Sequence, residues 1–143
     1  MKKLLFVVLL LSACSSGDNP EPDVIFTDVV STKTTSTNLV VSGVFEDGAH
    51  STTGEVKVEN VPGGERKLII TNLKSTLNDN KLRIWLSEDL KGTDYELISK
   101  TVVNGNSSYR LDANINLSKK KYVLIWCKPA VVLFGSTELK EPS

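Results

Sequence analysis

The stretch Tyr122-Val-Leu-Ile-Trp-Cys127-Lys-Pro-Ala-Val-Val-Leu-Phe-Gly135 contains two apolar runs separated by Lys128-Pro129. Both sets of alternating positions in the first run are apolar: Val123, Ile125 and Cys127 in one, and Tyr122, Leu124 and Trp126 in the other. This pattern is typical of a strand covered on both faces, so we expect Cys127 to lie in or beside the core. Proline donates no backbone hydrogen bond, so Pro129 ends this strand and a second one begins near Val131.

Upstream of this stretch, short strand-like segments alternate with turn signals, and no window shows a helical stripe. The segments are residues 39–45, 54–59, 67–73, 81–87, 95–98, 101–103 and 107–111. Asn104-Gly105-Asn106 separates the last two and predicts a hairpin turn, because Asn and Gly tolerate positive φ. Roughly eight or nine short strands in about a hundred residues indicate an all-β fold, an antiparallel sandwich or barrel that forms a single domain over residues 38–143.

The N-terminus has the order of a targeting segment, with Lys2 and Lys3 before an apolar run from Leu4 to Leu11. As a helix this run reaches about 12 Å against a hydrocarbon core of about 30 Å, so it is too short to span a membrane. Leu11-Ser12-Ala13-Cys14 then resembles the lipobox of bacterial lipoproteins, in which the cysteine receives diacylglycerol before cleavage on its N-terminal side. The alternative is an ordinary secretory peptide with an incidental cysteine.

These features divide the chain into a lipoprotein signal peptide at 1–13, a lipidated Cys14 with a tether and lead-in at 14–37, and the all-β domain at 38–143. A diacylated Cys14 would hold the protein in a lipid bilayer of the bacterial cell envelope. Ser15, where an Asp would favour inner-membrane retention, favours the outer membrane.

Composition excludes several classes of function. The 17 basic and 17 acidic side chains balance, which gives no electrostatic basis for binding nucleic acid. His50 is the only histidine, so protein groups alone do not supply a zinc site, and no metal is expected. No Gly-x-Ser-x-Gly elbow occurs, which makes a hydrolase a poor interpretation.

Three residues remain as candidates for chemistry or ligand contact. If Cys14 carries lipid, Cys127 has no intramolecular disulfide partner, and a lone thiol in an oxidising envelope is either buried or used. The apolar pattern around Cys127 favours burial, which suppresses the reactive thiolate. Trp85 and Trp126 are candidate ligand contacts. Trp85 has the outward parity of its strand, as Arg83 does, but a strand whose second face is also packed would show the same sequence pattern.

Several short motifs resemble one known family. They are Gly43-x-Phe45, His50-x-Thr52-x-Gly54, and Ile125-Trp126-Cys127-Lys128 followed by Phe134-Gly135-Ser136. Together they resemble the DM-thirteen domain, an electron-transfer module found beside DOMON domains in animal surface proteins and alone in bacterial lipoproteins. Ala130 departs from the pattern, since a bulky aromatic is usual there.

The resemblance implies a sandwich of the jelly-roll or DOMON-like type and a redox role for Cys127, either as a bare thiol or as a ligand to haem. His50 would be its base, its hydrogen-bond partner or a second ligand, and a redox partner protein would exchange electrons with it. A hypothesis of a different class is a non-enzymatic binding or structural module of the cell surface, in which Cys127 is only a core residue.

Overall fold

The computed structural model describes residues 38–76 and 80–143. The strands in this part of the chain are β1 (Leu39–Val44), β2 (Glu46–Asp47), β3 (Thr52–Val61), β4 (Glu65–Ser75), β5 (Leu82–Ser87), β6 (Tyr95–Ser99), β7 (Gly105–Leu111), β8 (Tyr122–Cys127) and β9 (Val132–Glu138). None of the described residues belongs to a helix long and apolar enough to cross a membrane. The signal peptide, Cys14 and the tether expected at 1–37 lie outside the described residues.

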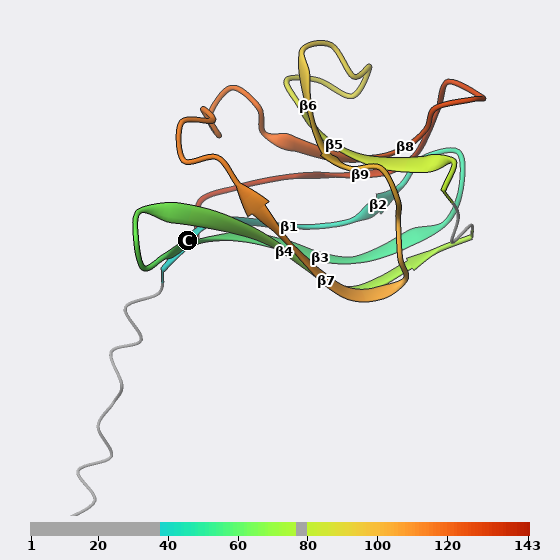
Figure 1. Cartoon of the computed structure of the whole chain (residues 1–143). Helices are drawn as coiled ribbons and strands as arrows, with labels where there is room; N and C mark the ends of the chain where they lie inside the picture. The colour runs from blue at the N-terminus through green and yellow to red at the C-terminus, as the bar shows by residue number, and fades with distance from the viewer. Residues whose placement is uncertain (1–37, 77–79) are drawn as a thin grey trace, which may run out of the picture. The chain divides into compact units, whose positions relative to one another are not determined.

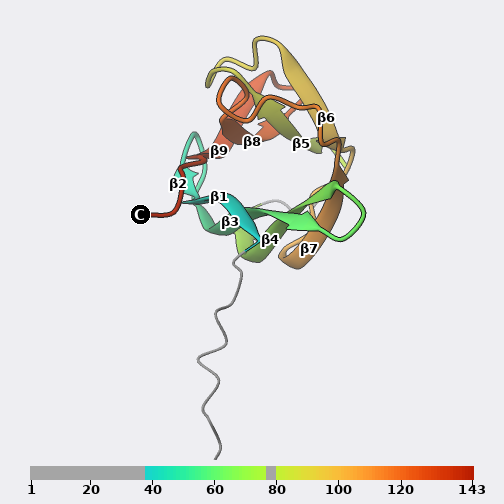
Figure 2. The ribbon, with the colours of Figure 1, turned by 90° about the vertical axis from the view of Figure 1, so that its left-hand side faces the viewer.

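The strands form two antiparallel sheets that pack face to face (Figure 1). One sheet has the order β1-β3-β4-β7 and the other the order β2-β9-β8-β5-β6. Viewed along the strands, the two layers enclose a common interior (Figure 2). The predicted all-β class and antiparallel sandwich are therefore confirmed.

The interior is filled by the inward-facing residues of both sheets. Val56 and Val58 from β3 and Leu68 and Ile70 from β4 are at most 1% exposed. On β8, Ile125 and its same-parity neighbours join this core, while Leu124 belongs to a second apolar cluster on the outer face. The prediction that β8 is covered on both faces is confirmed.

The β8–β9 connection also follows the sequence pattern. β8 ends at Cys127 and β9 begins at Val132, so Lys128-Pro129 lies in the turn as predicted. Val131 closes the turn with a φ of 55° and an exposed fraction of 73%. A β-branched residue in this left-handed region is strained, which identifies the turn as a tight connection rather than a continuation of either strand.

The two sheets meet where β1 and β2 pass from one layer to the other. Ser42 of β1 exchanges two backbone hydrogen bonds of 2.8 Å with Lys140, just beyond β9. A Cβ on Gly43 would collide with Thr137 Oγ1 and the Glu138 carbonyl oxygen of β9. Glycine is therefore required at position 43, because it alone lets the backbones of β1 and β9 approach this closely.

Two predictions about residues 101–106 are wrong. Residues 101–103 form no strand, and β7 begins at Gly105 and pairs with β4, so Asn104-Gly105-Asn106 is not a hairpin turn. Instead, Asn104 Oδ1 accepts a hydrogen bond from the Ser75 backbone N–H, and Asn106 Oδ1 accepts one from that of Asn72. The segment crosses from β6 in one sheet to β7 in the other, and its two asparagines fasten the start of β7 to β4.

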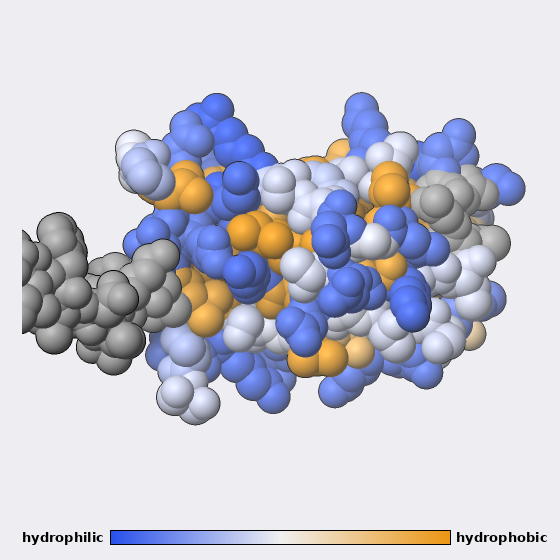
Figure 3. All heavy atoms as spheres, turned by 90° about the horizontal axis from the view of Figure 1, so that it is seen from below, coloured by the Kyte–Doolittle hydropathy of each residue, from blue (hydrophilic) through white to orange (hydrophobic). Residues whose placement is uncertain are grey.

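The outer face of the four-stranded sheet mixes apolar and polar side chains (Figure 3). On β3, Lys57 and Glu59 point outward and form an ion pair of 2.8 Å. Val44 is 64% exposed at the edge of this sheet. β3 is therefore exposed on one face, and among the described residues only the five-stranded sheet carries a second buried cluster.

Candidate functional site

Cys127 is the last residue of β8 and faces the interior. It pairs with Leu82 of β5 on one side and with Val132 of β9 on the other. Its exposed fraction is 6%, and it belongs to the main core cluster. Among the residues that the structure describes it is a free cysteine, so its thiol is not used in a disulfide. Because it is buried, it suits only chemistry in which the sulfur does not touch a dissolved molecule directly.

His50 lies in the loop between β2 and β3 and is exposed. Its backbone N–H donates to the Phe134 carbonyl oxygen at 3.3 Å, and its ring lies 3.9 Å from the Phe134 ring between centroids. These contacts place it beside the start of β9, at the end of the sheet where Cys127 also lies. Within residues 38–76 and 80–143 the structure contains no hydrogen bond between Cys127 and His50.

The arrangement does not fit haem, the prosthetic group that the resemblance implies. Haem needs an axial ligand directed into a cavity large enough for the macrocycle. The Cys127 side chain is packed among core residues, and His50 is held on an exposed loop. In the described part of the chain, no three His, Cys, Asp or Glu side chains are grouped so that they could hold a metal ion.

The two tryptophans occupy the outer face of the five-stranded sheet and are nevertheless buried. Trp85 is 7% exposed and Trp126 is 8% exposed, and their ring centroids lie 5.0 Å apart. Tyr95, at the start of β6, stacks on Trp85 with 3.9 Å between the ring centroids and an interplanar angle of 11°. Trp85 does point outward, as its parity predicts, but the outer face of this sheet is also packed. Of the three rings, only that of Tyr95 is exposed to solvent.

A model of the family Electron transfer DM13 matches residues 44–139 of the chain. The chain belongs to this family. No curated protein and no solved structure was found to match it.

The sandwich explains several DM13-like motif residues as structural ones. Gly43 permits the approach of β1 to β9, and Gly135 stands where a Cβ would collide with the Thr52 side chain. Thr52 itself is 1% exposed and donates its hydroxyl to the Phe134 carbonyl oxygen at 3.2 Å. Gly54 has a φ of 134° at an irregular point in the β3–β4 pairing. Gly43, Thr52 and Gly135 therefore lie where the two sheets of the DM13 domain are joined.

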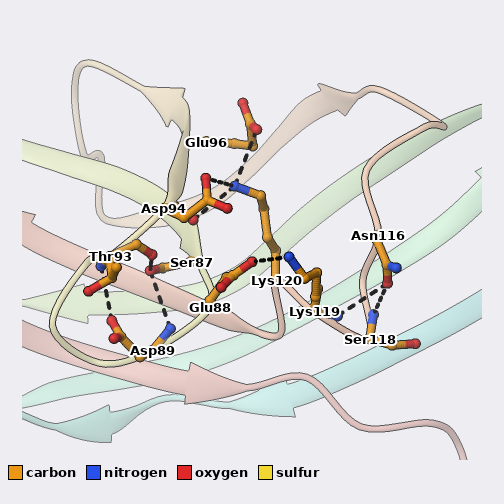
Figure 4. Close-up of polar contacts among 10 residues, drawn as sticks. All are labelled: Ser87, Glu88, Asp89, Thr93, Asp94, Glu96, Asn116, Ser118, Lys119 and Lys120. Atoms are coloured by element: carbon orange, nitrogen blue, oxygen red, sulfur yellow. Dashed lines mark hydrogen bonds and ion pairs between the residues drawn. The ribbon is translucent and has the colours of Figure 1, made fainter.

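The β5–β6 loop of the DM13 domain covers the ring of Trp85. Asp89 organises this loop, since its Oδ1 accepts a hydrogen bond from the backbone N–H of Lys91 at 2.9 Å. The same oxygen accepts one from the backbone N–H of Thr93 at 3.0 Å (Figure 4). The bond from Thr93 lowers the pKa of Asp89. Gly92, with a φ of 72°, then packs directly against the Trp85 ring. The loop is therefore a structured cover over the indole.

Two lysines of the β7–β8 connection fasten this cover. Lys119 lies 3.0 Å from Glu88, and Lys120 contacts both Asp94 and Glu96, at 2.8 and 3.4 Å (Figure 4). The side chain of Lys120 is only 12% exposed, and its hydrogen bond to Asp94 raises its pKa. Lys119 and Lys120 thus both face acidic residues of the β5–β6 loop and the start of β6.

The Asp94–Lys120 pair makes the stability of the DM13 domain depend on pH. The hydrogen bond from Lys120 holds the pKa of Asp94 below its ordinary value of 3.8 in the folded state. The pair therefore stabilises the fold above that pH, and this contribution is lost as the pH falls through the lowered pKa. We expect Asp94→Asn to have a lower urea midpoint than the parent at about pH 7, with the difference shrinking towards about pH 2. A difference that does not change with pH would contradict this assignment.

Gly92→Ala should destabilise the domain, because the new Cβ would meet Trp85 Cζ3 at 2.8 Å and Cε3 at 3.1 Å. We expect a loss of about 2 to 3 kcal/mol in the free energy of unfolding, from backbone strain and overpacking together. Gly63→Ala is the matched control, because Gly63 also has positive φ, 96°, but has nothing within 4 Å of the added Cβ. Equal losses for the two variants in urea unfolding would show that the loop does not press on the indole.

Proposed function

We propose that this chain is a lipid-anchored electron-transfer protein of the bacterial cell envelope whose redox group is the Cys127 thiol. The observation that carries the proposal is a free, buried thiol at the end of β8 in a domain that belongs to the Electron transfer DM13 family. The thiol is also the next residue after Trp126, which is part of a stack of aromatic rings that reaches the surface.

The burial of Cys127 favours electron exchange over thiol–disulfide exchange. Attack on a partner's disulfide requires the sulfur to reach the other sulfur atom directly. At 6% exposure and with strands paired on both sides, the Cys127 sulfur is poorly placed for such an attack. Electron tunnelling needs no atomic contact. An oxidised one-electron carrier would therefore take one electron from the thiol as the S–H bond breaks and its proton passes to solvent, and a reduced carrier would reverse the step.

The proposed anchor rests on the N-terminal sequence. Lys2-Lys3, the apolar run from Leu4 to Leu11 and the small residues before Cys14 stand in the order of a lipoprotein signal. Diacylation of Cys14 would fix the redox domain at a bilayer surface, and Ser15 favours the outer membrane. Metabolic labelling with a fatty acid tests this step, since label should enter the parent chain and be absent from Cys14→Ala.

The redox step is tested with the full chain in detergent and hexacyanoferrate(III) as the one-electron acceptor. We expect the parent to reduce the acceptor in proportion to its loss of Cys127 thiol, as counted after denaturation. Cys127→Ala should reduce none while keeping the far-ultraviolet circular dichroism of the sandwich. Equal reduction by Cys127→Ala and the parent would overturn the assignment to this thiol.

Burial also supports a second candidate function, a binding or structural module in which Cys127 only packs. In that case the native thiol should stay unreactive from about pH 5 to 9 and react only after denaturation, as expected for a thiol in apolar surroundings. Cys127→Ser should then lose about 1 to 3 kcal/mol of stability through its buried hydroxyl and keep its function. The partner would be a surface protein or ligand rather than an electron carrier.

A further inference from the structure

Three aromatic rings form a continuous stack across β6, β5 and β8. The Tyr95 and Trp85 centroids are 3.9 Å apart, with an interplanar angle of 11°. The Trp85 and Trp126 centroids are 5.0 Å apart, with an angle of 18°. Both pairs are close to parallel and within the separation at which aromatic rings contact each other. Electron tunnelling falls off exponentially with distance, so rings in such contact are good steps for single electrons.

The exposure of the rings changes abruptly along the stack. Trp126 and Trp85 are 8% and 7% exposed, whereas Tyr95 is 43% exposed. Gly92 of the β5–β6 loop is packed on the Trp85 ring and restricts water there. The stack therefore has a buried end, beside Cys127 in the chain, and a single end that opens to solvent.

We propose that Tyr95, Trp85 and Trp126 form a relay that carries single electrons between the Trp126–Cys127 segment and the surface. The relay rests on the proposed redox function, because it supplies the route by which a soluble one-electron carrier reaches the buried thiol. Tyr95 is the exposed residue at which the soluble carrier exchanges electrons with the relay. Trp85 is required between Tyr95 and Trp126.

Where no thiol is available for oxidation, as in Cys127→Ala, the chemistry of the three side chains determines where an oxidising equivalent on an indole ends. An oxidised indole in the interior is a buried cation, which is unfavourable in apolar surroundings. Tyr95 can give an electron to Trp126 through Trp85 and release its phenolic proton to water, because its ring is exposed. The indole is then neutral again, the O–H bond of Tyr95 is broken, and a neutral phenoxyl radical remains at the surface. A one-electron reductant of the ene-diol class restores it by supplying one electron, with a proton from water.

The test uses the full chain in detergent, with the azide radical generated by pulse radiolysis as the one-electron oxidant. The azide radical takes an electron from an indole and becomes azide. In the Cys127→Ala background we expect the indole-radical absorption to decay as the phenoxyl absorption grows, at a rate that is independent of protein concentration. Tyr95→Phe, which keeps the ring and removes the phenol, should abolish this phenoxyl growth and lengthen the lifetime of the indole radical.

Two further variants make the outcome specific. Trp85→Leu should uncouple the indole decay from the phenoxyl growth, and Tyr122→Phe, which alters the other tyrosine packed against the indole cluster, should leave the growth unchanged. The relay is overturned if the growth survives in Tyr95→Phe or Trp85→Leu, or if Tyr122→Phe abolishes it.

If the growth is seen in Cys127→Ala but the parent loses no thiol on oxidation, the relay stands and the redox role of Cys127 fails. With hexacyanoferrate(III) as the oxidant, equal loss of the Cys127 thiol in the parent and in Tyr95→Phe would mean that the redox role stands and the relay fails.

Discussion

Gly43→Ala is expected to lower the free energy of unfolding by about 3 kcal/mol. The added Cβ would lie 2.5 Å from the Glu138 carbonyl oxygen and closer still to Thr137 Oγ1. The carbonyl is backbone, fixed by the pairing of Glu138 with Tyr122 of β8, so it cannot turn away as a flexible side chain would. The alanine variant must therefore separate β1 from β9 at the place where the two sheets are joined.

Urea unfolding followed by circular dichroism measures this effect, with Ser42→Ala as the control. Ser42 is the neighbour of Gly43 on β1, and its two hydrogen bonds to Lys140 use backbone atoms that alanine retains. We expect Ser42→Ala to stay within about 0.5 kcal/mol of the parent. If Gly43→Ala unfolds at the same urea concentration as Ser42→Ala, then β1 and β9 do not approach as closely as the structure indicates.

The strands that the sequence predicts correctly are those whose pattern reports their burial directly. β3 alternates Val56 and Val58 with charged residues, and β8 is apolar on both parities, so each pattern indicates how many faces are covered. The role of Gly43 could not be predicted in the same way. It depends on a contact with Thr137, which is distant in the chain, and a sequence pattern carries no distance between two sheets.

The incorrect hairpin at residues 104–106 shows the limit of local turn signals. Asn-Gly tolerates positive φ, and Gly105 has a φ of 98°, so the local conformation is the expected one. What decides the topology is the pair of hydrogen bonds that the Oδ1 atoms of Asn104 and Asn106 accept from the backbone N–H groups of Ser75 and Asn72 of β4. Those partners are about thirty residues away, beyond the range of any turn rule.

At the candidate site, too, burial could be predicted from the sequence, whereas contacts between residues distant in the chain could not. The apolar neighbours of Cys127 predict its burial, and the structure gives it 6% exposure. Whether it meets His50 depends on the path of the β2–β3 loop, which Phe134 holds beside β9. The role of Tyr95 could not be predicted from the sequence, because its stacking on Trp85 follows from the register in which β6 pairs with β5. Alternation alone does not specify that register.

Trp85→Ala is expected to lower the free energy of unfolding by about 3 to 5 kcal/mol, because it empties the centre of the outer cluster. Trp85 is 7% exposed, contacts the rings of Tyr95 and Trp126, and lies opposite the fully buried Leu124 of β8. A tryptophan kept for ligand contact would be exposed and would cost little stability when removed. The size of the loss in urea unfolding therefore decides which of the two functions Trp85 has.

Leu97→Ala is the matched control, because Leu97 lies directly opposite Trp85 in the β5–β6 pairing and is 45% exposed. Its removal should change stability by about 0.5 kcal/mol, as is usual for an exposed position. Similar small losses for both variants would mean that the outer face is open to a ligand, and the buried part of the ring relay would lose its basis. A large loss for Trp85→Ala alone means that the same rings that would carry electrons also hold the five-stranded sheet and its covering loop together. Conservative ring substitutions such as Tyr95→Phe are then the suitable probes of electron transfer, because they leave that packing in place.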